Sequence, residues 1–149
     1  MNRKTIFIVL GLAAVLVFAF RGKIFNYGPD PWTEKQLMPP AALAQILNEP
    51  NGKKPIVLSI GFGGGIKGSK EIGAADDKEG IENLKKELNN FPKDANIVIY
   101  CGCCPFENCP NVRPAFELLN EMKFTNHSLL NLPQNLKADW IDKGYPMER

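Results

Sequence analysis

The segment 97–116 constrains the fold of this chain more than any other part of the sequence. It begins with a continuous apolar run, Ile97–Tyr100, passes through a loop that holds all four cysteines, and ends in a helical pattern. A short continuous apolar run followed by a loop and a helix is typical of a buried strand in a parallel sheet. The segment therefore predicts an α/β fold in which a strand delivers Cys101 to the edge of the sheet, where ligands bind.

The other apolar patterns extend this prediction over the domain. Apolar runs at 56–60 and 129–132 predict two more strands, and helical spacing predicts helices after Pro39, around 81–88, from Val112, and over 136–142. Helices that alternate with apolar strands indicate a mainly parallel sheet. Trp140 is expected in the core. His127 lies in a polar run and is expected at the surface.

The first 25 residues differ in composition from the rest. Basic residues flank an uninterrupted apolar run, residues 6–20. This length lies between the core of a secretory signal and a full membrane span, so residues 1–25 are predicted to be a hydrophobic anchor helix or a cleaved signal peptide. Either alternative predicts a membrane-anchored or secreted protein whose domain faces the extracytoplasmic (periplasmic) side.

The remaining chain divides into a linker and one domain. Residues 26–33 are rich in glycine and proline and read as a linker, in which Trp32 could sit at a membrane interface. Residues 34–149 form the predicted domain. The chain of 149 residues is long enough for one hydrophobic core. Its net charge of +2, with both signs interspersed, gives no support for nucleic-acid binding.

The cysteine loop predicts sulfur chemistry. Cys101 follows the buried strand, and a helix begins a few residues later, so its amino end could stabilise a thiolate, the reactive form of cysteine. Arg113 lies in the first turn of that helix and could hold an oxyanion such as thiosulfate or sulfite. Backbone N–H groups of the loop could add to the same anion site, and Gly102 and Asn111 are its candidate substrate-binding residues.

These pieces resemble a rhodanese-like (sulfurtransferase) domain over residues 34–149. The matching features are the strand that ends in Tyr-Cys at Cys101, Arg113 at the start of the next helix, the turn 66–69, the step from 122–124 into 129–132, and Trp140 followed by the Lys-Gly-Tyr-Pro of 143–146. The resemblance implies a three-layer fold and thiosulfate sulfurtransferase-like activity through a cysteine persulfide. It also implies a small sulfur-containing anion or persulfide donor, a thiol acceptor, and no cofactor.

The sequence leaves the nucleophile open. Position after the strand favours Cys101, with Cys104 further into the loop as the next candidate, so Cys101, Cys104 and Arg113 are the predicted catalytic residues. Cys103 and Cys109 are candidates for resolving the persulfide. Cys103, beside Cys104, is also a candidate nucleophile, and so is Cys109, because it lies nearest to Arg113 in sequence.

Three other interpretations of the cysteines stay open. Cys101, Cys103, Cys104 and Cys109 could together bind a metal ion, and soft Cu(I) would tolerate their crowding better than zinc. Cys101 and Cys104 form a Cys-x-x-Cys pair of the kind used in thiol–disulfide redox proteins. In an exported protein the four cysteines could also form structural disulfides without chemistry.

Overall fold

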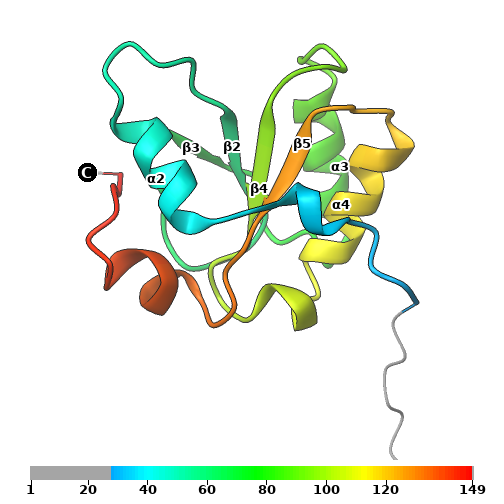
Figure 1. Ribbon diagram of the computed structural model, residues 1–149. Coiled ribbons are helices and arrows are strands. Elements are labelled where there is room, and N and C mark those ends of the chain that lie inside the picture. The colour runs from blue at the N-terminus through cyan, green and yellow to red at the C-terminus, as the bar shows by residue number, and fades with distance from the viewer. Residues whose placement is uncertain (1–27, 149) are drawn as a thin grey trace, which may run out of the picture.

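The computed structural model describes residues 28–148 as a parallel sheet with helices on both faces (Figure 1). The strands are β1 (Leu37–Met38), β2 (Ile56–Ser59), β3 (Ser69–Glu71), β4 (Ile97–Tyr100) and β5 (His127–Leu130), in the sheet order β1-β5-β4-β2-β3. The helices are α2 (Pro40–Asn48), α3 (Lys78–Leu88) and α4 (Val112–Glu121), with shorter turns η1 (Glu34–Gln36), η2 (Phe106–Asn108) and η3 (Lys137–Ile141). All four strand pairings are parallel, which confirms the predicted α/β class.

Alternating side chains of β4 divide the hydrophobic core into two layers. Ile97, Ile99 and Cys101 pack on the side of α3 and α4. Val98 and Tyr100 pack on the other side, against α2 and η3, where Trp140 is fully buried as predicted. Because successive residues of a strand point to opposite faces, this apolar run can serve both layers at once.

Local chemistry sets the starts of the helices. Pro40 opens α2, where its missing N–H costs nothing. Asp77 caps α3 by accepting a hydrogen bond from the backbone N–H of Gly80 at 2.8 Å. A side chain at position 80 would place its Cβ 1.8 Å from the carbonyl oxygen of Ala74, so only glycine allows this close approach of the backbone.

The expected position of Trp32 at a membrane interface is wrong in the described structure. Trp32 is only 7% exposed and packs in edge contacts against Phe106 and Phe116, with ring centroids 6.0 and 5.7 Å away. The side-chain amide of Asn120 also donates to the carbonyl of Pro31 at 2.9 Å. The described end of the predicted linker is therefore held against α4.

The expected surface position of His127 is also wrong. His127 is the first residue of β5, is buried against the ring of Phe116, and shares a hydrogen bond of 3.0 Å with Asn120. The strand predicted at 129–132 thus begins and ends two residues earlier. Burial lowers the pKa of His127, which favours the neutral ring.

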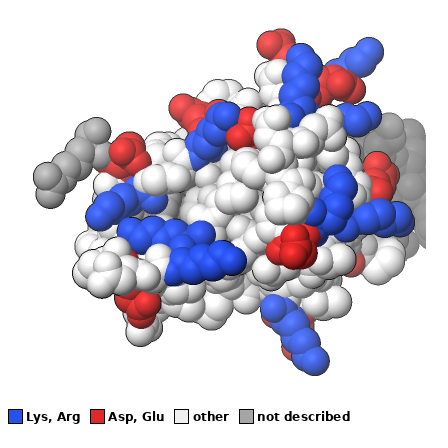
Figure 2. Space-filling view, turned by 90° about the horizontal axis from the view of Figure 1, so that it is seen from above, with Lys and Arg blue, Asp and Glu red and all other residues white. Residues whose placement is uncertain are grey.

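The predicted N-terminal helix lies outside the described residues. Within residues 28–148, no helix combines the length and apolar character needed to cross a membrane. Figure 2 views the molecule from the end where the strands of the sheet begin, and basic and acidic side chains are interspersed on this face. The visible face therefore has no large area of one sign.

Replacing Trp32 with alanine should lower the free energy of unfolding by about 3 to 5 kcal/mol, because it empties a buried aromatic position. The matched control is Phe62→Ala, since Phe62 is 68% exposed and its loss should cost no more than about 0.5 kcal/mol. Urea denaturation of both variants measures the difference. Equal, small effects would mean that Trp32 does not belong to the core.

Candidate functional site

The cysteine loop lies at the carboxyl end of β4, between β4 and α4. Three backbone hydrogen bonds hold it against segments distant in sequence. Gly102 donates to the carbonyl of Phe62 at 3.1 Å and accepts from the N–H of Leu136 at 3.0 Å, and Phe106 donates to Leu132 at 3.1 Å. The loop is therefore tied to the segments that follow β2 and β5. Gly102 uses both backbone polar groups for this purpose, and its substrate-binding role stays a prediction.

The structure brings the sulfur atoms of all four cysteines together. The Sγ atoms of Cys101 and Cys103 are 3.3 Å apart, and those of Cys103 and Cys104 are 3.2 Å apart. Cys109 joins them, so that all four Sγ atoms lie within 4.8 Å of one another. We call this group the thiol cluster. All four cysteines are free thiols, which does not support the interpretation as structural disulfides.

Burial divides the thiol cluster into an inner and an outer part. Cys101 and Cys109 are 2% and 3% exposed and belong to the hydrophobic core beside α4. Cys104 is half-buried and Cys103 is exposed. A molecule arriving from solvent would therefore meet Cys103 first.

Asn111 contacts the inner part of the cluster. Its side-chain N–H₂ group donates to Cys101 Sγ at 3.5 Å and to Cys109 Sγ at 3.8 Å, while its Oδ1 accepts from the backbone N–H of Asp76 at 3.0 Å. The Asn111 side chain is buried. The sequence predicted a substrate-binding role for Asn111, and the structure places its amide directly against the sulfur atoms.

Gly61 is a site residue that the sequence analysis missed. A Cβ atom at this position would lie 2.4 Å from Cys101 Sγ and 3.1 Å from Asn111 Nδ2. The backbone after β2 therefore passes so close to the cluster that no side chain fits. The available signal was the glycine-rich run 61–65, since glycine directly after a strand often marks a close approach of two backbones.

Neighbouring thiols and burial favour the protonated form of three cysteines. A hydrogen bond with the Cys109 thiol, followed by burial, raises the pKa of Cys101 far above the usual thiol range. Burial, followed by a hydrogen bond with Cys103, raises the pKa of Cys104 to about 11. Burial also raises the pKa of Cys103. In the resting cluster, the Cys109 thiol and burial thus oppose the thiolate that the sequence analysis expected at Cys101.

Arg113 is directed toward the N-terminal segment. Its guanidinium group forms an ion pair with Asp30, donates to the carbonyl of Pro29 at 3.2 Å, and lies 5.4 Å from the centre of the Trp32 ring. Part of its hydrogen-bonding capacity is thus used by residues before η1. A role for Arg113 in anion binding stays a prediction.

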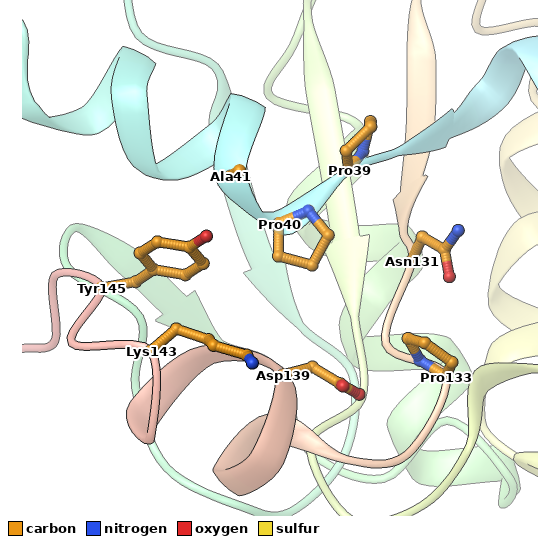
Figure 3. Close-up of a pocket in the computed structure, with 8 residues that line it drawn as sticks. All are labelled: Pro39, Pro40, Ala41, Asn131, Pro133, Asp139, Lys143 and Tyr145. Carbon is orange, nitrogen blue, oxygen red and sulfur yellow. The ribbon is translucent and has the colours of Figure 1, made fainter.

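A shallow pocket of about 300 Å³ lies elsewhere on the same edge of the sheet (Figure 3). Residues at the carboxyl ends of β1 and β5 meet the C-terminal segment there: Pro39, Pro40, Ala41, Asn131, Pro133, Asp139, Lys143 and Tyr145. None of these residues is a cysteine. The segment 132–136, which bonds to the cysteine loop, continues from the pocket residue Asn131.

Comparison with known proteins shows a similarity of fold to solved structures. No family model matches the chain, and no curated protein matches it. Two solved structures of EanB in complex with hercynine resemble it with a TM-score of 0.53 and 20% sequence identity; one carries a cysteine-to-serine change and the other a threonine-to-alanine change. The matches cover 76% of this chain but 27% and 28% of the EanB chains.

The likeness to EanB at this identity shows the α/β fold alone. Together with the fold, the thiol cluster is consistent with a role based on sulfur or thiol chemistry. Membership of the rhodanese-like family stays a prediction, as do the metal-binding and redox alternatives.

The raised pKa of Cys104 predicts an unusual pH dependence of its alkylation. Only the thiolate reacts, so with a pKa of about 11 the rate of reaction with iodoacetamide should rise about tenfold per pH unit between about pH 8 and pH 10. Peptide-mapped mass spectrometry of the reduced, chelator-treated protein measures this rate at Cys104. In the urea-unfolded control the rate should level off near the ordinary thiol pKa of about 8.5. A folded protein that levels off at the same pH as the control would contradict the described environment.

Proposed function

We propose that this domain transfers sulfane sulfur through a persulfide on the thiol cluster. The observation that supports the proposal is the grouping of four free thiols within 4.8 Å at the carboxyl edge of a parallel sheet. A thiol that has accepted a sulfur atom can pass it to a neighbouring thiol by the same displacement chemistry as thiol–disulfide exchange. The sequence resemblance to rhodanese-like domains points to the same reaction.

Cys103 is the proposed point of entry, because its thiol is the exposed member of the cluster. The Cys103 thiolate attacks the outer sulfur of thiosulfate and forms a persulfide. Sulfite leaves with the electron pair of the broken sulfur–sulfur bond. A persulfide donor reacts in the same way and releases its own thiolate.

Cys101 is the proposed carrier, since its Sγ lies 3.3 Å from that of Cys103. The Cys101 sulfur attacks the outer sulfur of the Cys103 persulfide, and the Cys101 proton passes to the departing Cys103 sulfur. One sulfur atom moves inward, and Cys103 returns as a thiol. An external thiol acceptor then takes the sulfur from Cys101. Alternatively, Cys104 or Cys109 attacks the inner sulfur of the persulfide, forming a disulfide and releasing hydrosulfide.

Asn111 and Arg113 are proposed to stabilise the negative charges of this reaction. The amide of Asn111 donates a hydrogen bond to the Cys101 sulfur, and this bond would strengthen as the sulfur becomes anionic. Arg113 would contribute by releasing its ion pair with Asp30 and binding the oxyanion of the sulfur donor instead. Gly102 would contribute by fixing the loop backbone beside the thiol cluster through its two hydrogen bonds.

The substrate class and the location of the protein are part of the same proposal. A small molecule as sulfur donor or acceptor fits the likeness to EanB, whose structures contain hercynine, although this chain spans about a quarter of EanB. We also propose that residues 6–20 anchor the domain in a membrane or direct its secretion, with the thiol cluster on the extracytoplasmic side.

Sulfur loading tests the proposed route. Reduced protein treated with thiosulfate should gain a sulfur atom on Cys101, detected by peptide-mapped mass spectrometry and removable by cyanide. Cys103→Ser should slow loading of Cys101 by about tenfold or more, because the entry thiol is gone. Cys101→Ser should leave the added sulfur on Cys103.

Two outcomes would contradict this route. If Cys103→Ser loads Cys101 as fast as the wild type, Cys103 is not the entry point. If the wild type gains no sulfur and its cysteines only reoxidise in pairs, the cluster is a redox site and does not transfer sulfur.

Asn111→Asp should slow persulfide formation roughly 10- to 100-fold, which corresponds to about 1.5 to 3 kcal/mol for a hydrogen bond to a charged group. The change keeps an acceptor for the N–H of Asp76 but replaces the N–H₂ donor beside Cys101 with a carboxylate oxygen. Sulfur-loading reactions quenched at successive times measure the rate of persulfide formation. The control is Asn131→Asp, which makes the same chemical change in the pocket of Figure 3. Equal rates for both variants would remove Asn111 from the reaction.

A further inference from the structure

We propose that the thiol cluster is a binding site for Cu(I). This function goes beyond sulfur transfer and uses the same four side chains, Cys101, Cys103, Cys104 and Cys109. The proposal stands on the spacing of the sulfur atoms, on the chemical uniformity of the donors, and on the contacts that hold them in place.

The spacing of the sulfur atoms suits one metal ion. In a tetrahedral thiolate site with metal–sulfur bonds of about 2.3 Å, neighbouring sulfur atoms lie about 3.8 Å apart. The observed Sγ–Sγ distances include 3.3 Å for Cys101–Cys103 and 3.2 Å for Cys103–Cys104, and none exceeds 4.8 Å. These distances lie on both sides of the required value, so small side-chain rotations bring the sulfur atoms into bonding range.

The donor set selects for a soft ion. Every ligand atom of the cluster is a cysteine sulfur, and within residues 28–148 no histidine or carboxylate joins the group. Thiolates favour Cu(I), Zn(II) and iron–sulfur clusters, whereas oxygen ligands are needed for magnesium or calcium. The cluster therefore excludes the hard cations by its chemistry.

The arrangement of the cysteines along the chain favours Cu(I) over Zn(II). Structural zinc sites combine separated Cys-x₂₋₄-Cys pairs that can reach the corners of a regular tetrahedron. Here all four ligands come from one loop, and Cys103 and Cys104 are adjacent. Adjacent cysteines depart from the spacing of zinc knuckles, whereas soft Cu(I) tolerates thiolates crowded in this way.

Contacts within the protein hold the sulfur atoms in place. Asn111 donates to both inner sulfurs, Cys101 and Cys109, and contacts of this kind orient the ligands in metal sites. The backbone bonds of Gly102 fix the loop that carries the outer pair. The exposed thiol of Cys103 gives the ion a path into the cluster. Each ligating thiol releases its proton to solvent, and the ion stays Cu(I), so no oxidant or reductant is consumed.

Competition with a Cu(I) chelator tests the proposal on the reduced full-length chain. The chain is titrated with Cu(I) under anaerobic conditions in the presence of bathocuproine disulfonate, whose Cu(I) complex is coloured. We expect about one Cu(I) per chain to resist the chelator, and Cu(I) to displace Zn(II) from a zinc-loaded sample. Failure of the wild type to retain Cu(I), or failure of Cu(I) to displace Zn(II), would overturn the proposal.

Serine variants test whether the cluster acts as a unit. In Cys104→Ser and Cys109→Ser, the chelator should remove Cu(I) at concentrations lower by about tenfold or more. Cys103→Ser is the variant that keeps the test decisive if Cys109→Ser fails to fold, because Cys103 is exposed. Phe62→Leu, on the adjacent loop, is the matched control and should retain Cu(I) like the wild type. Serine variants that retain Cu(I) as well as the wild type would overturn the site.

The Cu(I) and sulfur-loading experiments distinguish a failure of the copper site from a failure of sulfur transfer. A chain that retains Cu(I) but gains no sulfur from thiosulfate would overturn the proposed function and leave the copper site standing. A chain that gains sulfur but loses all Cu(I) to the chelator would overturn the copper site alone.

Discussion

The pairing of β4 on both of its edges is the interaction on which the rest of the structure depends. β4 lies between β2 and β5, all four of its residues are buried, and its alternating side chains fill both core layers. A shift of register by one residue would exchange the two faces of the strand, so the packing of both layers holds the strand in place. Cys101 directly follows this strand. The position of Cys101, the first thiol of the loop, is therefore set by the hydrophobic packing of β4.

The surroundings of the thiol cluster are assembled from segments that are far apart in sequence. Gly61 brings the backbone after β2 against Cys101, and Asn111 joins the start of α4 to the backbone of Asp76 and to the two inner sulfurs. The segment after β5 bonds to the loop through Leu132 and Leu136. The carboxyl ends of neighbouring parallel strands thus converge on the thiols, which is the general reason why such sheets carry their sites at this edge.

Sequence patterns predicted the elements that bury continuous apolar surface and missed those that depend on distant partners. β2, β4 and α4 were predicted because their apolar residues repeat locally. β1 has two half-buried residues and β3 has three residues that are mostly exposed, and both strands exist through their pairing with β5 and β2. The same limit applies to the site. The cysteine spacing predicted the grouping of the thiols, whereas their protonation depends on burial, and the orientation of Arg113 depends on Asp30. Trp32 and His127 were misplaced because polar or proline-rich neighbours conceal a buried side chain from a local pattern.

The position of all four sulfurs on one short loop has a thermodynamic consequence. A crosslink or a bound ion stabilises a fold mainly by restricting the unfolded chain, and this effect grows with the length of chain that is enclosed. Any bond among Cys101, Cys103, Cys104 and Cys109 encloses only a few residues, and the unfolded chain can form the same local groupings. Oxidation, and the proposed changes of sulfur load and metal occupancy, would thus be nearly uncoupled from folding. The two core layers around β4 can stay intact while the loop passes from one chemical state to another.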